Sequence, residues 1–146
     1  MRQAVPTYHI LLIEDDPADA GLVRIALRRG RYPVALHHAR NAAEAFAFLR
    51  RSDPEQAQAP RPHLILLDLN LPGRSGHEIL LDLKKDEGLR GIPVVVLSTS
   101  EAERDIASSY ALGANSFVSK PMDADEFARH IHGVQDYWFD IVRLPV

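Results

Sequence analysis

The sequence predicts an α/β fold: one domain built on a five-stranded parallel sheet with helices on both faces. Two observations lead to this prediction. Short apolar runs alternate with longer segments of helical periodicity, five times along the chain. The run at 64–67 has four consecutive apolar residues, which is typical of a strand buried on both faces. A length of 146 residues suits one domain with one core.

The first half of the chain supplies two strands and two helices. The first strand is expected at 9–13, and Pro17 is a favoured first residue for the helix that follows. The second strand is expected at 34–39, and Asn41 can cap the second helix. The segment 52–62 is rich in Pro, Gln and Ala, so we expect a surface loop there.

The second half repeats the pattern three times. Gly113 suits the left-handed end of the fourth helix, and Pro93 suits the start of a strand. In chain order, the expected elements are a strand at 64–67, a helix from about 75 to 88, a strand at 94–97, a helix at about 101–112, a strand at 116–118 and a helix from about 123 past 132.

The composition excludes several classes of protein. A hydrophobic content of 46% with 25% charged residues indicates a folded domain. The absence of cysteine excludes disulfides, zinc–thiolate sites and thiol nucleophiles. We expect a cytoplasmic protein without membrane association, because no apolar run reaches spanning length and the N-terminus does not resemble a signal peptide. A net charge of -3 gives no indication of nucleic-acid binding.

Polar side chains stand at the ends of the predicted strands. Asp68 ends the buried third strand, where a carboxylate is costly unless it has a partner or a role. The carboxyl ends of parallel strands share one edge of the sheet, which is where ligands bind. The other strand ends bring to this edge two acids, two hydroxyls and one ammonium, namely Glu14, Asp15, Ser98, Thr99 and Lys120.

These residue types suit a divalent cation and a visiting anion. Asp15 and Asp68 can both present an oxygen to Mg²⁺, which uses few carboxylates and keeps several waters, with Glu14 reaching it through water. Lys120 offers a point charge, and Ser98 a hydroxyl, to an anion such as phosphate. The alternative is that Asp68 merely pairs with Lys120 at the end of the sheet.

The chain closely resembles the receiver domain of two-component response regulators, from about residue 9 to 133. The resemblance implies a flavodoxin-like strand order of 2-1-3-4-5. Four motifs at the family's spacing carry it: LLIEDDP at 11–17, LILLDLNLPGRSG at 64–76, PVVVLSTS at 93–100 and SFVSKP at 116–121.

The resemblance implies a role for each residue at this edge. Asp68 falls on the phosphoacceptor, and Glu14 and Asp15 fall on the acidic pair that binds Mg²⁺, with Glu14 replacing the commoner Asp. Asn70 falls where a backbone carbonyl binds the metal. Ser98 falls on the hydroxyl that turns toward the phosphate, and Thr99 falls on the family's small residue. Lys120 falls on the family's lysine, and the bond between Lys120 and Pro121 falls on its cis peptide. Phe117 falls on the aromatic switch.

The implied function is a phosphorylation switch. Asp68 takes a phosphoryl group from a sensor histidine kinase, and the protein signals through an interaction surface made by the fourth helix, fifth strand and fifth helix. Such a protein catalyses only its own phosphotransfer and dephosphorylation. The alternative within this family is a phosphate shuttle or sink, distinguished by a short-lived phosphoryl group.

Two other classes of Asp- or nucleotide-dependent enzyme fit less well. A haloacid-dehalogenase-like phosphatase needs a second acid two residues after its nucleophile, where this chain has Asn70. A dinucleotide enzyme needs a glycine-rich turn after the first strand, and here that turn is acidic.

The C-terminal segment from about 134 is unusually apolar. We expect the last helix to run past the domain edge and to form a homodimer through Phe127, Trp138 and Phe139. The alternative is a tail that folds back onto its own sheet. The segment WFDIVRLPV at 138–146 resembles the tail of regulators that partner bacterial phytochrome kinases, which implies a bacteriophytochrome as the kinase.

Overall fold

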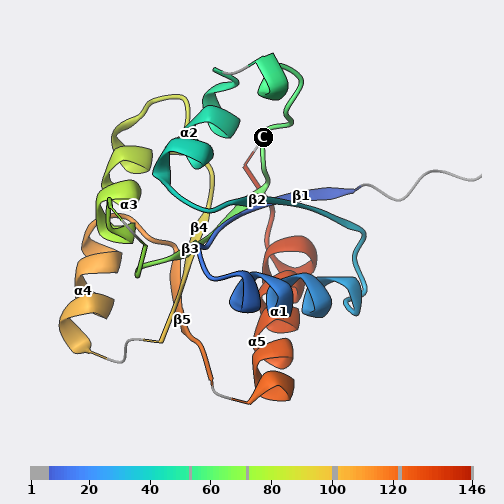
Figure 1. Ribbon diagram of the computed structural model, residues 1–146. Coiled ribbons are helices and arrows are strands. Elements are labelled where there is room, and N and C mark those ends of the chain that lie inside the picture. The colour runs from blue at the N-terminus through green and yellow to red at the C-terminus, as the bar shows by residue number, and fades with distance from the viewer. Residues whose placement is uncertain (1–6, 53, 72, 100–101, 122, 146) are drawn as a thin grey trace, which may run out of the picture.

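The computed structural model describes residues 7–52, 54–71, 73–99, 102–121 and 123–145. All strands pair in parallel, in the order β2-β1-β3-β4-β5, which confirms the predicted fold class and topology (Figure 1). The strands are β1 (Tyr8–Ile13), β2 (Val34–Ala39), β3 (Leu64–Asp68), β4 (Val94–Ser98) and β5 (Ser116–Ser119).

Helices cover both faces of the sheet and create two apolar cores. On one face lie α1 (Pro17–Arg28) and α5 (Ala124–Asp136). On the other lie α2 (Ala42–Arg50), α3 (Gly76–Lys85) and α4 (Glu103–Ala111) (Figure 1). Strands β3 and β4 are buried at every position, because both of their faces pack against helices.

The helix ends follow the capping residues of the sequence. The Asn41 side chain accepts a hydrogen bond from the Glu44 N–H at 2.9 Å, which confirms it as the N-cap of α2. Gly113 has a φ of +107°, a left-handed conformation that suits glycine just after α4. Helix α3 ends earlier than expected, at Lys85, and the expected start of the fourth helix near Glu101 lies outside the described residues.

The C-terminal segment folds back on its own domain, so the expectation of a helix without a partner surface is wrong. Helix α5 continues into a π-helical segment, η2 (Tyr137–Ile141). The side chains of Trp138 and Phe139 are only 9% and 8% exposed. The Phe139 ring stacks on the Tyr8 ring with centroids 4.0 Å apart. Tyr8 is the first residue of β1, which begins one residue earlier than expected.

No helix within the described parts of the chain is long and apolar enough to cross a membrane.

Candidate functional site

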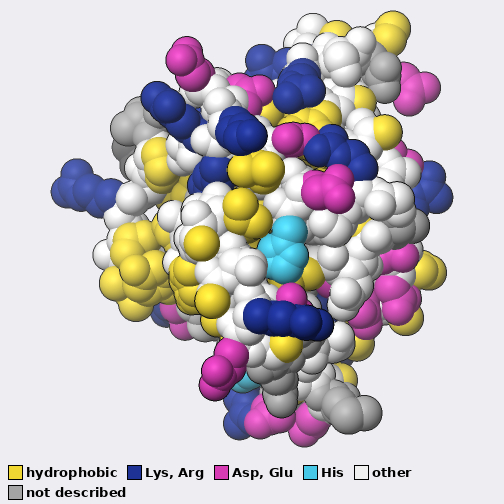
Figure 2. Space-filling model, turned by 90° about the vertical axis from the view of Figure 1, so that its left-hand side faces the viewer, with side chains coloured by type: hydrophobic (Ala, Val, Ile, Leu, Met, Phe, Trp, Pro, Cys, Tyr) yellow, Lys and Arg dark blue, Asp and Glu magenta, His cyan; other side chains and the backbone are white. Residues whose placement is uncertain are grey.

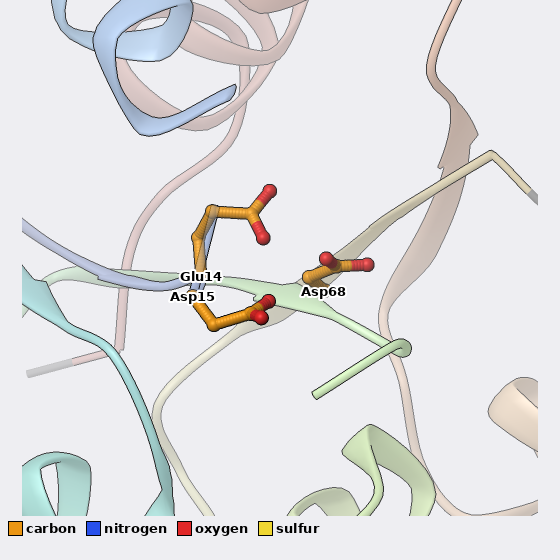
Figure 3. A group of neighbouring side chains, drawn as sticks. All are labelled: Glu14, Asp15 and Asp68. Carbon is orange, nitrogen blue, oxygen red and sulfur yellow. The ribbon is translucent and has the colours of Figure 1, made fainter. Parts of the chain in front are cut away.

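Three carboxyl groups meet where β1 and β3 end. The parallel register places Ile13 beside Leu67, so the residues that follow each of them become neighbours. The carboxyl oxygens of Glu14, Asp15 and Asp68 can all lie within 4.8 Å of one another (Figure 3). Glu14 and Asp68 are buried, whereas Asp15 is exposed.

Burial makes the charge on Glu14 costly. Desolvation, reinforced by a hydrogen bond with Asp68, raises the pKa of Glu14 to about 8, although Lys120 acts in the opposite direction. Burial therefore disfavours the charged form of Glu14. A divalent cation would supply the positive charge that both Glu14 and Asp68 need.

Lys120 lies among these acids. It comes directly after β5, and its side chain is 8% exposed. Its Nζ donates to Glu14 Oε1 at 2.6 Å and lies 3.6 Å from Asp68 Oδ2. Burial lowers the pKa of Lys120, but the hydrogen bond to Glu14 and the charges of Asp68 and Glu14 outweigh it and leave that pKa raised.

A further carboxylate, Asp19, escaped the sequence analysis. Its Oδ2 accepts a hydrogen bond from Lys120 Nζ at 3.1 Å, and its side chain is 35% exposed. Asp19 lies in the first turn of α1, four residues after Asp15. Acids are common in a first turn because they complement the helix dipole, so the sequence did not distinguish Asp19 from an ordinary one.

The backbone fixes the orientation of Asp68. The Asn70 N–H donates to Asp68 Oδ1 at 3.2 Å, while Oδ2 of the same carboxylate faces Lys120. The Asn70 residue itself is exposed. The two oxygens of Asp68 therefore have different neighbours, one a neutral donor and the other a cation.

Ser98 and Thr99 end β4 beside this carboxylate. Ser98 is fully buried, and its carbonyl oxygen accepts a hydrogen bond from the Lys120 backbone N–H at 2.8 Å. Thr99 is exposed. The register between β4 and β5 pairs Ser98 with Ser119, which brings Lys120 to the same edge as Asp68.

The expected cis peptide between Lys120 and Pro121 is wrong, because no peptide bond in the described segments is cis. The trans bond is the favoured form even before proline. Lys120 reaches Glu14 and Asp68 with this trans bond.

Phe117 is linked to α4 through its backbone. Its side chain is partly buried against the core that contains α2 and α3. Its N–H donates to the Tyr110 hydroxyl at 3.1 Å. Tyr110 belongs to α4 and is 49% exposed. This contact could not be predicted from the sequence, because it depends on how α4 lies beside β5.

The donor set fits a hard divalent cation. Carboxylate oxygens are the preferred ligands of Mg²⁺, and the exposed Asp15 leaves one side of the cluster open to water. Glu14, Asp15 and Asp68 are the residues that would hold such a cation. In contrast, Phe127, Trp138 and Phe139 belong to the core between the sheet and α1 and α5.

Comparisons with known proteins agree with this geometry. The family model described as the response regulator receiver domain matches residues 10–132. The response regulator Rcp1 of a Synechocystis species is 39% identical over 140 residues, which cover 96% of this chain and 95% of Rcp1.

Two solved structures are similar over nearly the whole chain. The phosphorylated cyanobacterial phytochrome response regulator RcpA is 40% identical, with a TM-score of 0.90 and coverage of 97% of this chain and 100% of RcpA. The Mn²⁺-bound form of Rcp1 is 39% identical, with a TM-score of 0.87 and coverage of 95% of this chain and 99% of that one.

Proposed function

The chain belongs to the response regulator receiver family, and from this premise we propose that Asp68 accepts a phosphoryl group from a partner histidine kinase. One observation carries this proposal. Asp68 lies at the end of a central strand with a backbone N–H on one oxygen and the Lys120 ammonium facing the other. Its neighbours Glu14 and Asp15 complete a carboxylate cluster suited to a divalent cation.

The proposed reaction is a transfer between two nucleophiles. An Asp68 oxygen attacks the phosphorus of a phosphohistidine, an oxygen–phosphorus bond forms, and the phosphorus–nitrogen bond breaks with its electrons returning to the imidazole. Lys120 neutralises charge on the phosphoryl oxygens. The cation held by Glu14, Asp15 and Asp68, with the Asn70 carbonyl as the family's further ligand, would add positive charge opposite those oxygens.

We propose Mg²⁺ as the cation. The cluster offers only oxygen ligands, which suit Mg²⁺ and Mn²⁺ alike, and the relative Rcp1 is known in a Mn²⁺-bound form. A side-by-side titration with the two metals tests this choice.

Phosphorylation would be transmitted through β5 and α4. The new group adds about one further negative charge beside Ser98 and Thr99. The Phe117 N–H donates a hydrogen bond to the Tyr110 hydroxyl of α4, so a movement of Phe117 would shift Tyr110 and α4 with it. We propose that the resulting change alters a protein-interaction surface.

Figure 2 shows the face of the molecule that carries α3 and α4. Among the described side chains of this face, basic groups are interspersed with acidic and hydrophobic ones, which favours a protein partner over nucleic acid. A phosphoryl group lost within seconds would instead favour the phosphate shuttle or sink.

The partner kinase is proposed to be of the phytochrome type. RcpA is a phytochrome response regulator, and this chain covers all of it at 40% identity. The cytoplasm is the expected site of such an encounter. Transfer from a purified phytochrome kinase, compared with an unrelated histidine kinase, tests the pairing.

We propose in addition a homodimer, with an interface that differs from the expected one. Phe127, Trp138 and Phe139 are buried in their own chain, so they have little surface left for a partner. In the same segment Tyr137 and Ile141 are 49% and 70% exposed. Light scattering at tens of micromolar should give a dimer that Ile141→Glu disrupts. A wild-type monomer, with and without a phosphoryl analogue, would contradict the proposal.

The central proposal is tested by incubating the protein with acetyl phosphate and Mg²⁺ and measuring its intact mass. The expected result is the mass gain of one phosphoryl group, which disappears when the metal is chelated. No mass gain from either acetyl phosphate or a panel of kinases would contradict it.

A further inference from the structure

We infer that Asp19 is a positioning residue that restrains Lys120 and thereby weakens the binding of a phosphoryl group at Asp68. The inference rests on the proposed function of Asp68 and extends it to a residue outside the family motifs quoted above. Its basis is that the ammonium of Lys120 is held closer to Asp19 than to the acceptor.

The distances around Lys120 carry the inference. An ammonium has three N–H donors. Lys120 Nζ donates one of them to Glu14 Oε1 at 2.6 Å and another to Asp19 Oδ2 at 3.1 Å, both within hydrogen-bond range. The distance to Asp68 Oδ2 is 3.6 Å, too long for a good hydrogen bond. Before phosphorylation the lysine therefore leans away from the acceptor, toward β1 and α1.

Asp19 differs from Glu14 and Asp68, the other acids near Lys120, because it is not a candidate ligand of the cation. Glu14 and Asp68 belong to the carboxylate cluster that suits a cation, whereas Asp19 is not part of that cluster. The Asp19 side chain instead forms a hydrogen bond and an ion pair with Lys120. When a cation occupies the cluster and engages Glu14, Asp19 remains as a partner of the lysine.

The sign of the effect follows from charge. A phosphoryl group on Asp68 brings anionic oxygens that must attract Lys120 in competition with Asp19. The Lys120 side chain is 8% exposed, so water does little to screen this competition on the lysine side. Removing the Asp19 charge leaves Lys120 less neutralised and free to move toward the phosphoryl oxygens.

Because the Asp19 side chain is 35% exposed, the effect should be of the size found for partly exposed ion pairs, about fivefold in a binding constant.

The experiment measures binding of beryllium trifluoride, a phosphoryl analogue, in the presence of Mg²⁺ by fluorine NMR. Asp19→Asn keeps the size of the side chain and removes its charge, and it should bind the analogue about fivefold more tightly than the wild type. Asp16→Asn is the matched control. This substitution removes one charge from the same helix start and leaves asparagine, which caps helices well, at the N-cap. The Asp16 side chain caps α1 by accepting a hydrogen bond from the Ala18 N–H and is not a partner of Lys120.

A second readout needs no metal. In the metal-free protein, the Lys120 ammonium signal in a proton–nitrogen spectrum should exchange with water faster in Asp19→Asn than in Asp16→Asn, because one of its two short hydrogen bonds loses its charged acceptor and becomes weaker. A purely structural role for Asp19 would not produce this difference.

Each outcome is decisive. Equal affinities for the analogue in Asp19→Asn and Asp16→Asn overturn the inference but leave the proposed function standing. Weaker binding by Asp19→Asn than by Asp16→Asn also overturns it, because Asp19 would then hold Lys120 in its productive place. A wild type that binds no analogue with Mg²⁺ overturns the proposed function and this inference together.

Discussion

The Lys120 ammonium lies 2.6 Å from the Glu14 carboxylate, although 106 residues separate them in the chain. Glu14 follows β1 and Lys120 follows β5, and the sheet places β3 and β4 between those strands. The side chain of Lys120 must therefore reach across the ends of two strands. Asp68 is the last residue of β3, the strand next to β1. The contact between Lys120 and Glu14 therefore places a cation beside the candidate phosphoacceptor.

Asp68→Asn should abolish labelling by a cognate phosphokinase, because an amide oxygen is too weak a nucleophile to replace the carboxylate. Labelled phosphate and intact mass give the measurement. The fold should persist, since the substitution keeps the size of the side chain and removes one of two crowded acids. Acid-labile label retained by this variant would assign the acceptor role to another carboxylate.

Asp15→Asn should weaken Mg²⁺ binding about tenfold or more and slow phosphotransfer, because the site loses one of its few charged ligands. Isothermal calorimetry measures the affinity. Lys120→Ala is the complementary variant. It keeps all three carboxylates of the cluster and should bind Mg²⁺, but it loses the ammonium beside Asp68 and should be phosphorylated slowly. An unchanged Mg²⁺ affinity in Asp15→Asn would make Asp15 an ordinary turn residue.

A group of stacked histidines should destabilise the protein as the pH drops below about 6.5. The His37 and His9 ring nitrogens are 3.0 Å apart, and His63 stacks on His9. Burial, followed by the nearby charge of His9, lowers the pKa of His37 and that of His63. Below pH 6.5 these two histidines therefore bind more protons in the unfolded chain than in the folded one, and their contribution to the free energy of unfolding decreases. Glu14 acts in the opposite direction, because its pKa, raised to about 8, favours the folded state as the pH falls, so the histidine contribution is measured as a difference between the wild type and a variant.

Urea unfolding at pH 7.5 and 5.5 measures this contribution. Between these two pH values His37→Gln should lose less stability, or gain more, than the wild type, whereas His130→Gln, at an exposed position of α5, should change as the wild type does. An equal change in all three proteins would show that His37 does not contribute to the pH dependence.

Phe139→Ala should destabilise the protein by about 3 kcal/mol or more, the usual cost of truncating a buried phenylalanine. Its ring is 8% exposed and stacks on Tyr8. Ile141→Ala, at a position 70% exposed in the same segment, should change the stability by about 0.5 kcal/mol at most. Equal effects of the two substitutions in chemical denaturation would show that the tail does not pack as described.

The sequence could predict the strands and most of the site because both depend on local patterns. The run 64–67 is apolar because its strand is covered on both faces, and Asp68 stands out only by ending it. Asp19 could not be predicted as a partner of Lys120, since the fold brings the first turn of α1 next to a residue that follows β5, 101 positions after Asp19 in the chain.

The packing of the C-terminal segment could not be predicted for a similar reason. Whether Phe139 is buried depends on the distant rings of Tyr8 and Tyr32, which no pattern within the last helix can reveal. The cis form of the peptide bond before Pro121 is implied by the family resemblance alone, whereas this chain has a trans bond there.

The stacking of Phe139 on Tyr8 also bears on the order in which the chain acquires its structure. The two residues are 131 positions apart, so this contact closes one of the longest loops available to the chain. Contacts of such sequence separation form late, after local helices and neighbouring strands have reduced the entropy of closure. During synthesis, Tyr8 at the start of β1 therefore stays exposed until almost the whole polypeptide, including Phe139, has been made. Until then a chaperone, or β1 of another nascent chain, can bind to it.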